Sequence, residues 1–188
     1  MGHAPSGGLL LSHPFSWANY PLANGSSYPY KLTKYCYDAS YGNEGFTDTL
    51  TELENADDAA TVNLGPAWRL PTKAECEELA NTSRFEWLWQ DSSYAMMGGK
   101  LVTSNDTGLS LFLPAAGRCH TRLMGRNQTG HYWTTTLGTT PTHANHLSLS
   151  NTEQHVRHDY RYEGYTIRPV LSAGVNPILS GFDTEITF

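Results

Sequence analysis

Four of the eight histidines lie in two short patterns, HANH and HVRH, which could form a metal site. His143 and His146 make up the first pattern, and His155 and His158 make up the second. Neutral imidazole is a common zinc ligand, which favours a metal interpretation. The spacing argues against it, because residues three positions apart on a strand point to opposite faces, whereas helical zinc pairs are usually four apart. We therefore expect these histidines to bind neither a metal nor another cofactor.

A catalytic trio is the second chemistry that the residue types allow. Ser148, His155 and Asp159 could serve as nucleophile, base and orienting acid if the fold brought them together. The chain has no GxSxG motif, no papain-like cysteine context and no phosphate-binding GxxxxGK or GxGxxG loop. Asp57 and Asp58 lack the alternating oxygens of an EF-hand loop, which favours a helix-start role over calcium binding. We expect a protein without catalytic activity, and an enzyme or metal-dependent lectin that uses the histidines stays an alternative.

A binding surface is the third interpretation, and it concerns residues 119–165. This segment is rich in His, Arg, Tyr, Ser and Thr, whose rings, forked donors and hydroxyls are typical of paratopes. Six of the eight histidines lie between His120 and His158, and no lysine follows Lys100. A solvated polar sheet face, the alternative, explains the polarity but not the absence of lysine beside abundant arginine. The composition therefore favours recognition.

The charge distribution limits the classes of partner. The chain of 188 residues has a net charge of −6, yet residues 118–168 hold six of the eight arginines. A pI near 5.7 with only four lysines is unlike a nucleic-acid-binding protein, so no nucleic-acid partner is expected. The three cysteines have no CxxC spacing and indicate no disulfide framework. No apolar run reaches the roughly 20 residues of a membrane helix, so no membrane insertion is expected.

Local signals predict two helices before the polar segment. In ENADDAATVNLGPAW, Asn55 or an aspartate can cap a short helix through Val62, which Gly65 would end. In RLPTKAECEELANTS, Thr72 and Glu75 have the spacing of a capping box, which predicts a helix over residues 73–80.

Short alternating runs separated by turn residues predict strands in the second half, in an antiparallel arrangement. Residues 1–29 show no sustained period and are expected to be irregular, with packing through Phe15, Trp17 and Tyr20. We expect one α+β domain over residues 1–188. The strand-like runs are residues 85–90, 100–105, 109–117, 131–137, 143–150, 155–161 and 165–171.

The pieces YKLTKYCYDASYGNEGFTDTLTELENADDAATVNLGPAWRLPTKAECEEL, LFLPAAGR, GHYWTTTL and YEGYTIRPV resemble, in this order, the Fibrobacter succinogenes major paralogous domain of bacterial surface proteins. The resemblance covers residues 30–170 and leaves residues 171–188 as a C-terminal extension. WRLPTKAE and GYTIRPV are also similar to pieces of formylglycine-generating enzymes, which implies a C-type-lectin-like fold of the sulfatase-modifying-factor type. The catalytic cysteines of those enzymes have no counterpart in GYTIRPV, so their oxidase activity is not implied. Cys76 stands where the family usually has tryptophan, and the family's W-A-x-x-N-V-G opening is missing.

One branch of this fold contains the variable proteins of diversity-generating retroelements, in which template adenines are copied with errors. Former AAC or AAT codons then encode residues such as His, Arg, Tyr, Ser and Thr, but never Lys, Glu, Gln, Met or Trp. The resemblance therefore implies a variable region over residues 119–165, which agrees with its lack of lysine. Within this region it implies fixed positions at Met124, Trp133, Glu153, Gln154 and Glu163.

Together these features predict a non-catalytic receptor-binding or adhesin domain, on a bacterial surface or a phage tail fibre. Its partner would be a protein or glycan receptor on a cell surface, and oligomer formation is compatible with this role. A fixed surface or pilus module without diversified residues is the structural alternative. We expect Leu147, Leu149, Val156 and Ile167 to hold strands to the core. The expected ligand-contacting residues are His120, Arg122, Arg126, His131, His143, His146, Ser148, Ser150, His155, Arg157, His158, Tyr160 and Tyr165.

Overall fold

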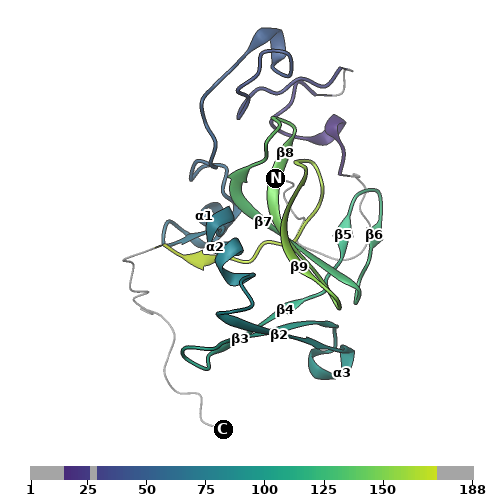
Figure 1. Ribbon diagram of the computed structural model, residues 1–188. Helices are drawn as coiled ribbons and strands as arrows, with labels where there is room; N and C mark the ends of the chain where they lie inside the picture. Colours follow the sequence, from purple (N-terminus) through teal and green to yellow (C-terminus); the bar gives the residue numbers. More distant parts are fainter. Residues whose placement is uncertain (1–14, 26–28, 173–188) are drawn as a thin grey trace.

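The computed structural model describes residues 15–25 and 29–172 (Figure 1). The parts of the expected N-terminal segment and C-terminal extension that fall on residues 1–14, 26–28 and 173–188 lie outside the described residues. The described part is mixed α+β, with antiparallel strands in small sheets, few helices and much loop. None of its helices is long and apolar enough to cross a bilayer. The helices are α1 (Ala59–Leu64), α2 (Lys73–Leu79) and α3 (Ser92–Ala95), with 3-10 turns at Trp17–Asn19 and Asn43–Gly45.

The central sheet consists of β7, β8 and β9, paired antiparallel in chain order. A second three-stranded sheet, β2–β3–β4, lies below the central sheet in Figure 1 and closes the core. The hairpin β5–β6 lies beside the central sheet. A short pair, β1–β10, completes the set. The strands are β1 (Trp68–Arg69), β2 (Phe85–Gln90), β3 (Gly99–Ser104), β4 (Ser110–Pro114), β5 (Arg118–Cys119), β6 (Leu123–Met124), β7 (Thr129–Leu137), β8 (His143–Ser150), β9 (Gln154–Tyr160) and β10 (Val170–Leu171).

One side of the central sheet packs in the main core. Tyr132, Leu147 and Val156 are partners in one row across β7, β8 and β9, so their side chains share this side. They pack with buried residues of α2, β3 and β4, including Cys76 and Leu113. The prediction that Leu147, Leu149 and Val156 anchor the strands is confirmed. Ile167 packs in a separate cluster, against Trp133 and Leu70.

Both predicted helices are confirmed, and capping fixes where each begins. In α1, the Asp58 carboxylate accepts hydrogen bonds from the amides of Ala60 and Thr61, and Gly65 ends the helix with a positive φ of 90°. In α2, Thr72 and Glu75 form the expected capping box. Because α2 contacts β7, β8 and β9, its capped start sets its position against the core side of the sheet.

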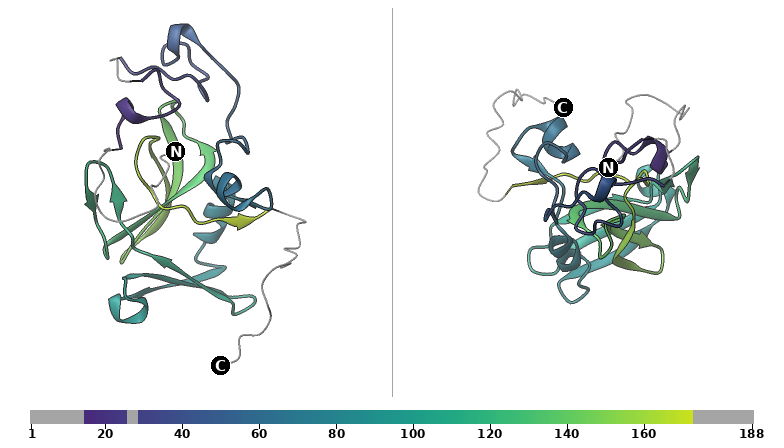
Figure 2. Two further views of the ribbon diagram at one scale, coloured as in Figure 1. Left: turned by 180° about the vertical axis from the view of Figure 1, so that it is seen from behind. Right: turned by 90° about the horizontal axis from the view of Figure 1, so that it is seen from above.

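The N-terminal part, residues 15–25 and 29–48, covers the end of the central sheet that lies away from β2–β3–β4, as both side views show (Figures 1 and 2). Tyr20, Leu32 and Cys36 form a small buried cluster there, with Trp17 packed against it. The guanidinium of Arg161 joins this part to the end of β9. The expected packing through Trp17 and Tyr20 is thus confirmed, although a 3-10 turn interrupts the irregular backbone.

The prediction of a strand over residues 165–171 is largely wrong. Thr166 forms an isolated parallel bridge with Tyr132, and only Val170–Leu171 belong to a strand, β10. The segment exchanges two backbone hydrogen bonds with β7 and then turns away, since Pro169 has no amide hydrogen to donate. The hairpin β5–β6 and helix α3 were not predicted.

Candidate ligand-binding face

The side of the central sheet opposite the main core carries polar residues in rows. His131 on β7 is the partner of Ser148 on β8, which is the partner of His155 on β9. In the next row, His146 on β8 is the partner of Arg157 on β9. Side chains in one row lie on the same side of a sheet, and residues two apart on a strand share that side. We call the following set the polar face: His131, Ser148, Ser150, His155 and Arg157.

Three other predicted residues lie on the opposite side of the sheet, which corrects the expectation of one continuous surface. β8 and β9 pair without a bulge, so His158 and Tyr160 have the opposite parity to His155 and Arg157. His143 lies between them, with its ring centroid 5.5 Å from that of His158 and 4.5 Å from that of Tyr160. These three rings form a separate group beside the N-terminal part. They do not extend the polar face.

His146 is buried rather than presented to a ligand, which is a second correction. Its side chain is 3% exposed, because it lies among Trp133, His131 and Tyr165. Burial lowers the pKa of His146 to about 3, and the neighbouring His131 contributes to this. Burial likewise lowers the pKa of half-buried His131 to about 4. Both imidazoles are therefore neutral at neutral pH and act as aromatic packing groups.

Tyr165 covers the inner end of the polar face. Its ring stacks on Trp133 with centroids 4.5 Å apart, and on His131 with centroids 4.8 Å apart. Its hydroxyl donates a 2.8 Å hydrogen bond to Asp159, and burial raises the pKa of Tyr165. Burial alone would raise the pKa of Asp159, but the hydrogen bond from Tyr165 and the charge of Arg118, 3.9 Å away, help to lower it overall. The inner end of the face is thus ordered by rings and one ion pair.

The outer end of the polar face is exposed, and its side chains meet at one carboxylate. Arg157 donates a 2.9 Å hydrogen bond to the Glu153 carboxylate, and His155 lies 3.6 Å from the same carboxylate. Ser148 and Ser150 on β8 are half-buried beside them. Forked guanidinium donors, imidazole and hydroxyl groups are here within one short stretch of sheet. They can pair with carboxylate, sulfate or hydroxyl groups of a partner.

The remaining predicted residues lie on or next to the hairpin β5–β6. Arg122 and Arg126 are exposed. His120 lies 3.3 Å from the buried carboxylate of Glu163, whose pKa is raised by burial. Two backbone hydrogen bonds between Cys119 and Gly164 tie the hairpin to the segment that carries Tyr165. Arg122 and Arg126 thus add charge beside the sheet, whereas His120 has a partner within the fold.

The catalytic trio considered from the sequence does not assemble in the described residues. Ser148 and His155 are partners on neighbouring strands, but Asp159 is four residues along β9 from His155, roughly 13 Å away. Asp159 accepts instead from Tyr165. In residues 15–25 and 29–172, no three His, Cys, Asp or Glu side chains are grouped so that they could hold a metal ion.

The sequence did not indicate that Arg118 and Asp159 lie beside the polar face, nor that a pocket lies on the opposite side of the sheet. The Arg118–Asp159 pair and the pocket are both formed by side chains from distant segments, which no local sequence pattern brings together. Comparison with known proteins finds no matching family model, no similar curated protein and no similar solved structure. The polar face is therefore interpreted from its own geometry, and the family resemblance stays a prediction.

Proposed function

We propose that the chain is a non-catalytic binding domain whose polar face contacts a protein or glycan receptor on a cell surface. One observation carries the proposal. The register of β7–β8–β9 separates core anchors such as Leu147 from polar residues such as Ser148, His155 and Arg157 on the other side of the same strands. A surface of this kind can change its side chains without changing the strands that hold them.

The proposal includes a C-type-lectin-like fold and diversification of residues 119–165 by a retroelement, at a bacterial surface or on a phage tail fibre. Two of the positions that the adenine chemistry must leave fixed, Trp133 and Glu153, have structural roles, which supports this part. Trp133 is 1% exposed, and its indole nitrogen donates to the carbonyl oxygen of Glu163. Glu153 accepts a hydrogen bond from Arg157. Constant residues would thus position variable ones.

The charges of the candidate surface favour an acidic receptor. Arg157, Arg122 and Arg126 are exposed. Only Arg157 has a carboxylate partner among the described residues, namely Glu153. Guanidinium groups form charge-assisted, bidentate hydrogen bonds with carboxylate and sulfate groups, and the neighbouring histidine rings can stack on sugars or aromatic side chains. We therefore expect preference for acidic glycans or acidic protein surfaces.

Binding to an array of acidic and neutral glycans, and to intact cells, tests the proposal. The double variant H155A/R157A should bind at least tenfold more weakly to whichever probe the unaltered protein retains. R84A is the matched control, because Arg84 is an exposed arginine on the turn between α2 and β2. Equal binding by the double variant, or no binding of any probe by the unaltered protein, would contradict the proposal.

A further inference from the structure

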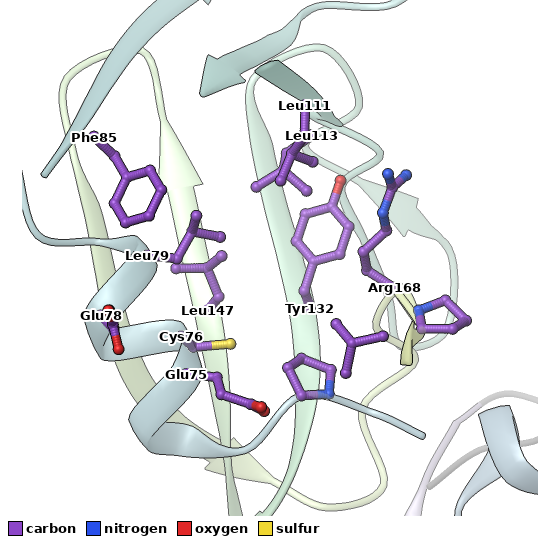
Figure 3. A pocket seen from close by; sticks show the side chains of 13 residues that line it. Glu75, Cys76, Glu78, Leu79, Phe85, Leu111, Leu113, Tyr132, Leu147 and Arg168 are labelled. Carbon is purple, nitrogen blue, oxygen red and sulfur yellow. The ribbon is translucent and has the colours of Figure 1, made fainter. Parts of the chain in front are cut away.

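A pocket of about 440 Å³ lies on the core side of the central sheet, opposite the polar face. Figure 3 shows it between α2 and the segment that carries Arg168. Its wall is apolar and comes from α2, β4, β8 and the start of β2: Leu79, Phe85, Leu111, Leu113 and Leu147. Pockets of 300–1,000 Å³ with apolar walls and few polar groups are typical small-molecule sites.

Two glutamates at the pocket are already neutralised by arginines outside it. Glu75 accepts two hydrogen bonds from Arg69, at 2.7 and 2.5 Å, which lower the pKa of Glu75 to about 2. Glu78 forms an ion pair with Arg84. Each carboxylate therefore has its own counter-charge, and neither needs a cation from a ligand.

Arg168 is different, because it forms no ion pair or side-chain hydrogen bond with any described residue. Its side chain extends along the ring of Tyr132 at the edge of the pocket (Figure 3). The hydroxyl of Tyr132 already donates to the carbonyl oxygen of Pro114. Among the described residues, Arg168 is thus the charged group at the pocket that has no counter-ion. Its guanidinium lies at the edge of the apolar wall.

We propose that this pocket binds an aliphatic carboxylate, with the chain against the apolar wall and the carboxylate paired with Arg168. A methylene group is about as large as a water molecule, which occupies about 30 Å³, so the pocket has the volume of about 15 such groups and has room for a chain of about ten carbons with its carboxylate. Guanidinium and carboxylate have matching planar geometry. The proposal goes beyond receptor binding and does not depend on it, because the pocket and the polar face share no residue.

Calorimetric titration of the full chain with hexanoate, octanoate and decanoate tests the proposal. The dissociation constant should fall about fourfold for each added methylene, as expected for burial of the chain. Decanol and decyltrimethylammonium, which have the same chain without a carboxylate, should bind at least tenfold more weakly than decanoate. Equal affinities for decanoate and decanol would overturn the proposal.

Arg168→Gln should lose the preference for decanoate over decanol while still binding decanol, which shows that the pocket is intact. Lys31→Gln, which removes a positive charge far from the pocket, should keep the preference. An unchanged preference in Arg168→Gln, or no binding of any compound by the unaltered protein, overturns the proposal. Sedimentation is the second measurement: a dimer that decanoate leaves intact and that Arg168→Gln dissociates would show that a second copy of the chain, and not an aliphatic carboxylate, occupies the pocket, which also overturns the proposal.

Discussion

Burial of His131 and His146 makes their rings part of the packing at the inner end of the polar face. His146 and His131 lie with their rings against Tyr165, and the described residues offer no hydrogen-bond partner to the Nδ1 atom of either imidazole. Charging such a ring would place a cation among aromatic groups, so the neutral form is favoured. Asp159 partly offsets this effect, whereas Arg157 adds to it. The polar face thus depends on imidazoles that stay uncharged.

We predict that stability falls as the pH is lowered below the pKa of an unfolded histidine, about 6.5. The folded-state pKa of His146, about 3, is lower than this, so the unfolded state binds more protons. The stabilisation is fully present above pH 6.5 and is lost progressively towards the folded pKa. For His146 alone the loss at about pH 5 is about 2 kcal/mol. Urea denaturation should show a smaller loss for His146→Gln than for the unaltered protein or for His155→Gln; equal losses in all three would contradict this assignment.

Arg161 is the residue that most firmly joins the N-terminal part to the central sheet. Its side chain is 2% exposed and donates to the carbonyl oxygens of Pro141 at 2.7 Å, Tyr35 at 2.8 Å and Lys34 at 3.1 Å. It also donates to the hydroxyl of Tyr20 at 3.0 Å. All four acceptors are uncharged oxygens in the interior or at its edge. The guanidinium supplies the hydrogen-bond donors that water would otherwise provide to them.

We predict that Arg161→Ala lowers the free energy of unfolding by about 3 kcal/mol, since it leaves buried carbonyl oxygens without donors. Arg161→Lys should recover less than half of this loss, because one ammonium cannot reach acceptors arranged for a forked guanidinium. Chemical denaturation measures both values. Arg122→Ala, at an exposed arginine, is the control and should change the stability by less than about 0.5 kcal/mol. A mild effect of Arg161→Ala would refute this role.

Helix α2 is the element that contributes both to the core side of the central sheet and to the pocket. Its capping box fixes where it begins, and its inner side both packs on the central sheet and borders the pocket, through Cys76 and Leu79. Glu75 belongs both to the capping box and to the ion pair with Arg69. A change in the first turn of α2 should therefore affect overall stability and the pocket together.

We predict that Thr72→Ala lowers the free energy of unfolding by about 1 kcal/mol, because the amide of Glu75 loses its acceptor. Denaturation in urea measures this change. Thr121→Ala in the exposed turn of the β5–β6 hairpin is the matched control and should change stability by less than about 0.5 kcal/mol. Equal effects of the two variants would contradict the capping assignment.

The elements that the sequence predicted are those with local signals. The capping box predicted α2, and period-two runs predicted β7, β8 and β9, because both patterns arise within a few residues. The parity of His155 and His158 could also have been read from the sequence, and it would have divided the site into two groups. The burial of His146 and the position of Arg168 across the pocket from α2 could not, because each depends on contacts between distant segments.

At the scale of the whole molecule, the central sheet separates two surfaces of different chemistry. One side carries the polar face and the exposed arginines beside it, and the other supports an apolar pocket edged by Arg168. We propose that the first surface is a diversified binding site. If so, sequence variation must follow the strand parity, changing polar positions and sparing their buried neighbours.

Sequencing the locus in many cells or isolates is the most direct test of diversification at the polar face. Substitutions are counted at each codon from 119 to 165, and the neighbouring DNA is searched for a near-copy with AAC or AAT at the varying codons. We expect variation at polar-face codons such as those of His155 and Arg157, with Trp133, Gln154 and Leu147 unchanged. A uniform locus without a template copy, or substitutions spread equally over core and polar codons, would contradict it.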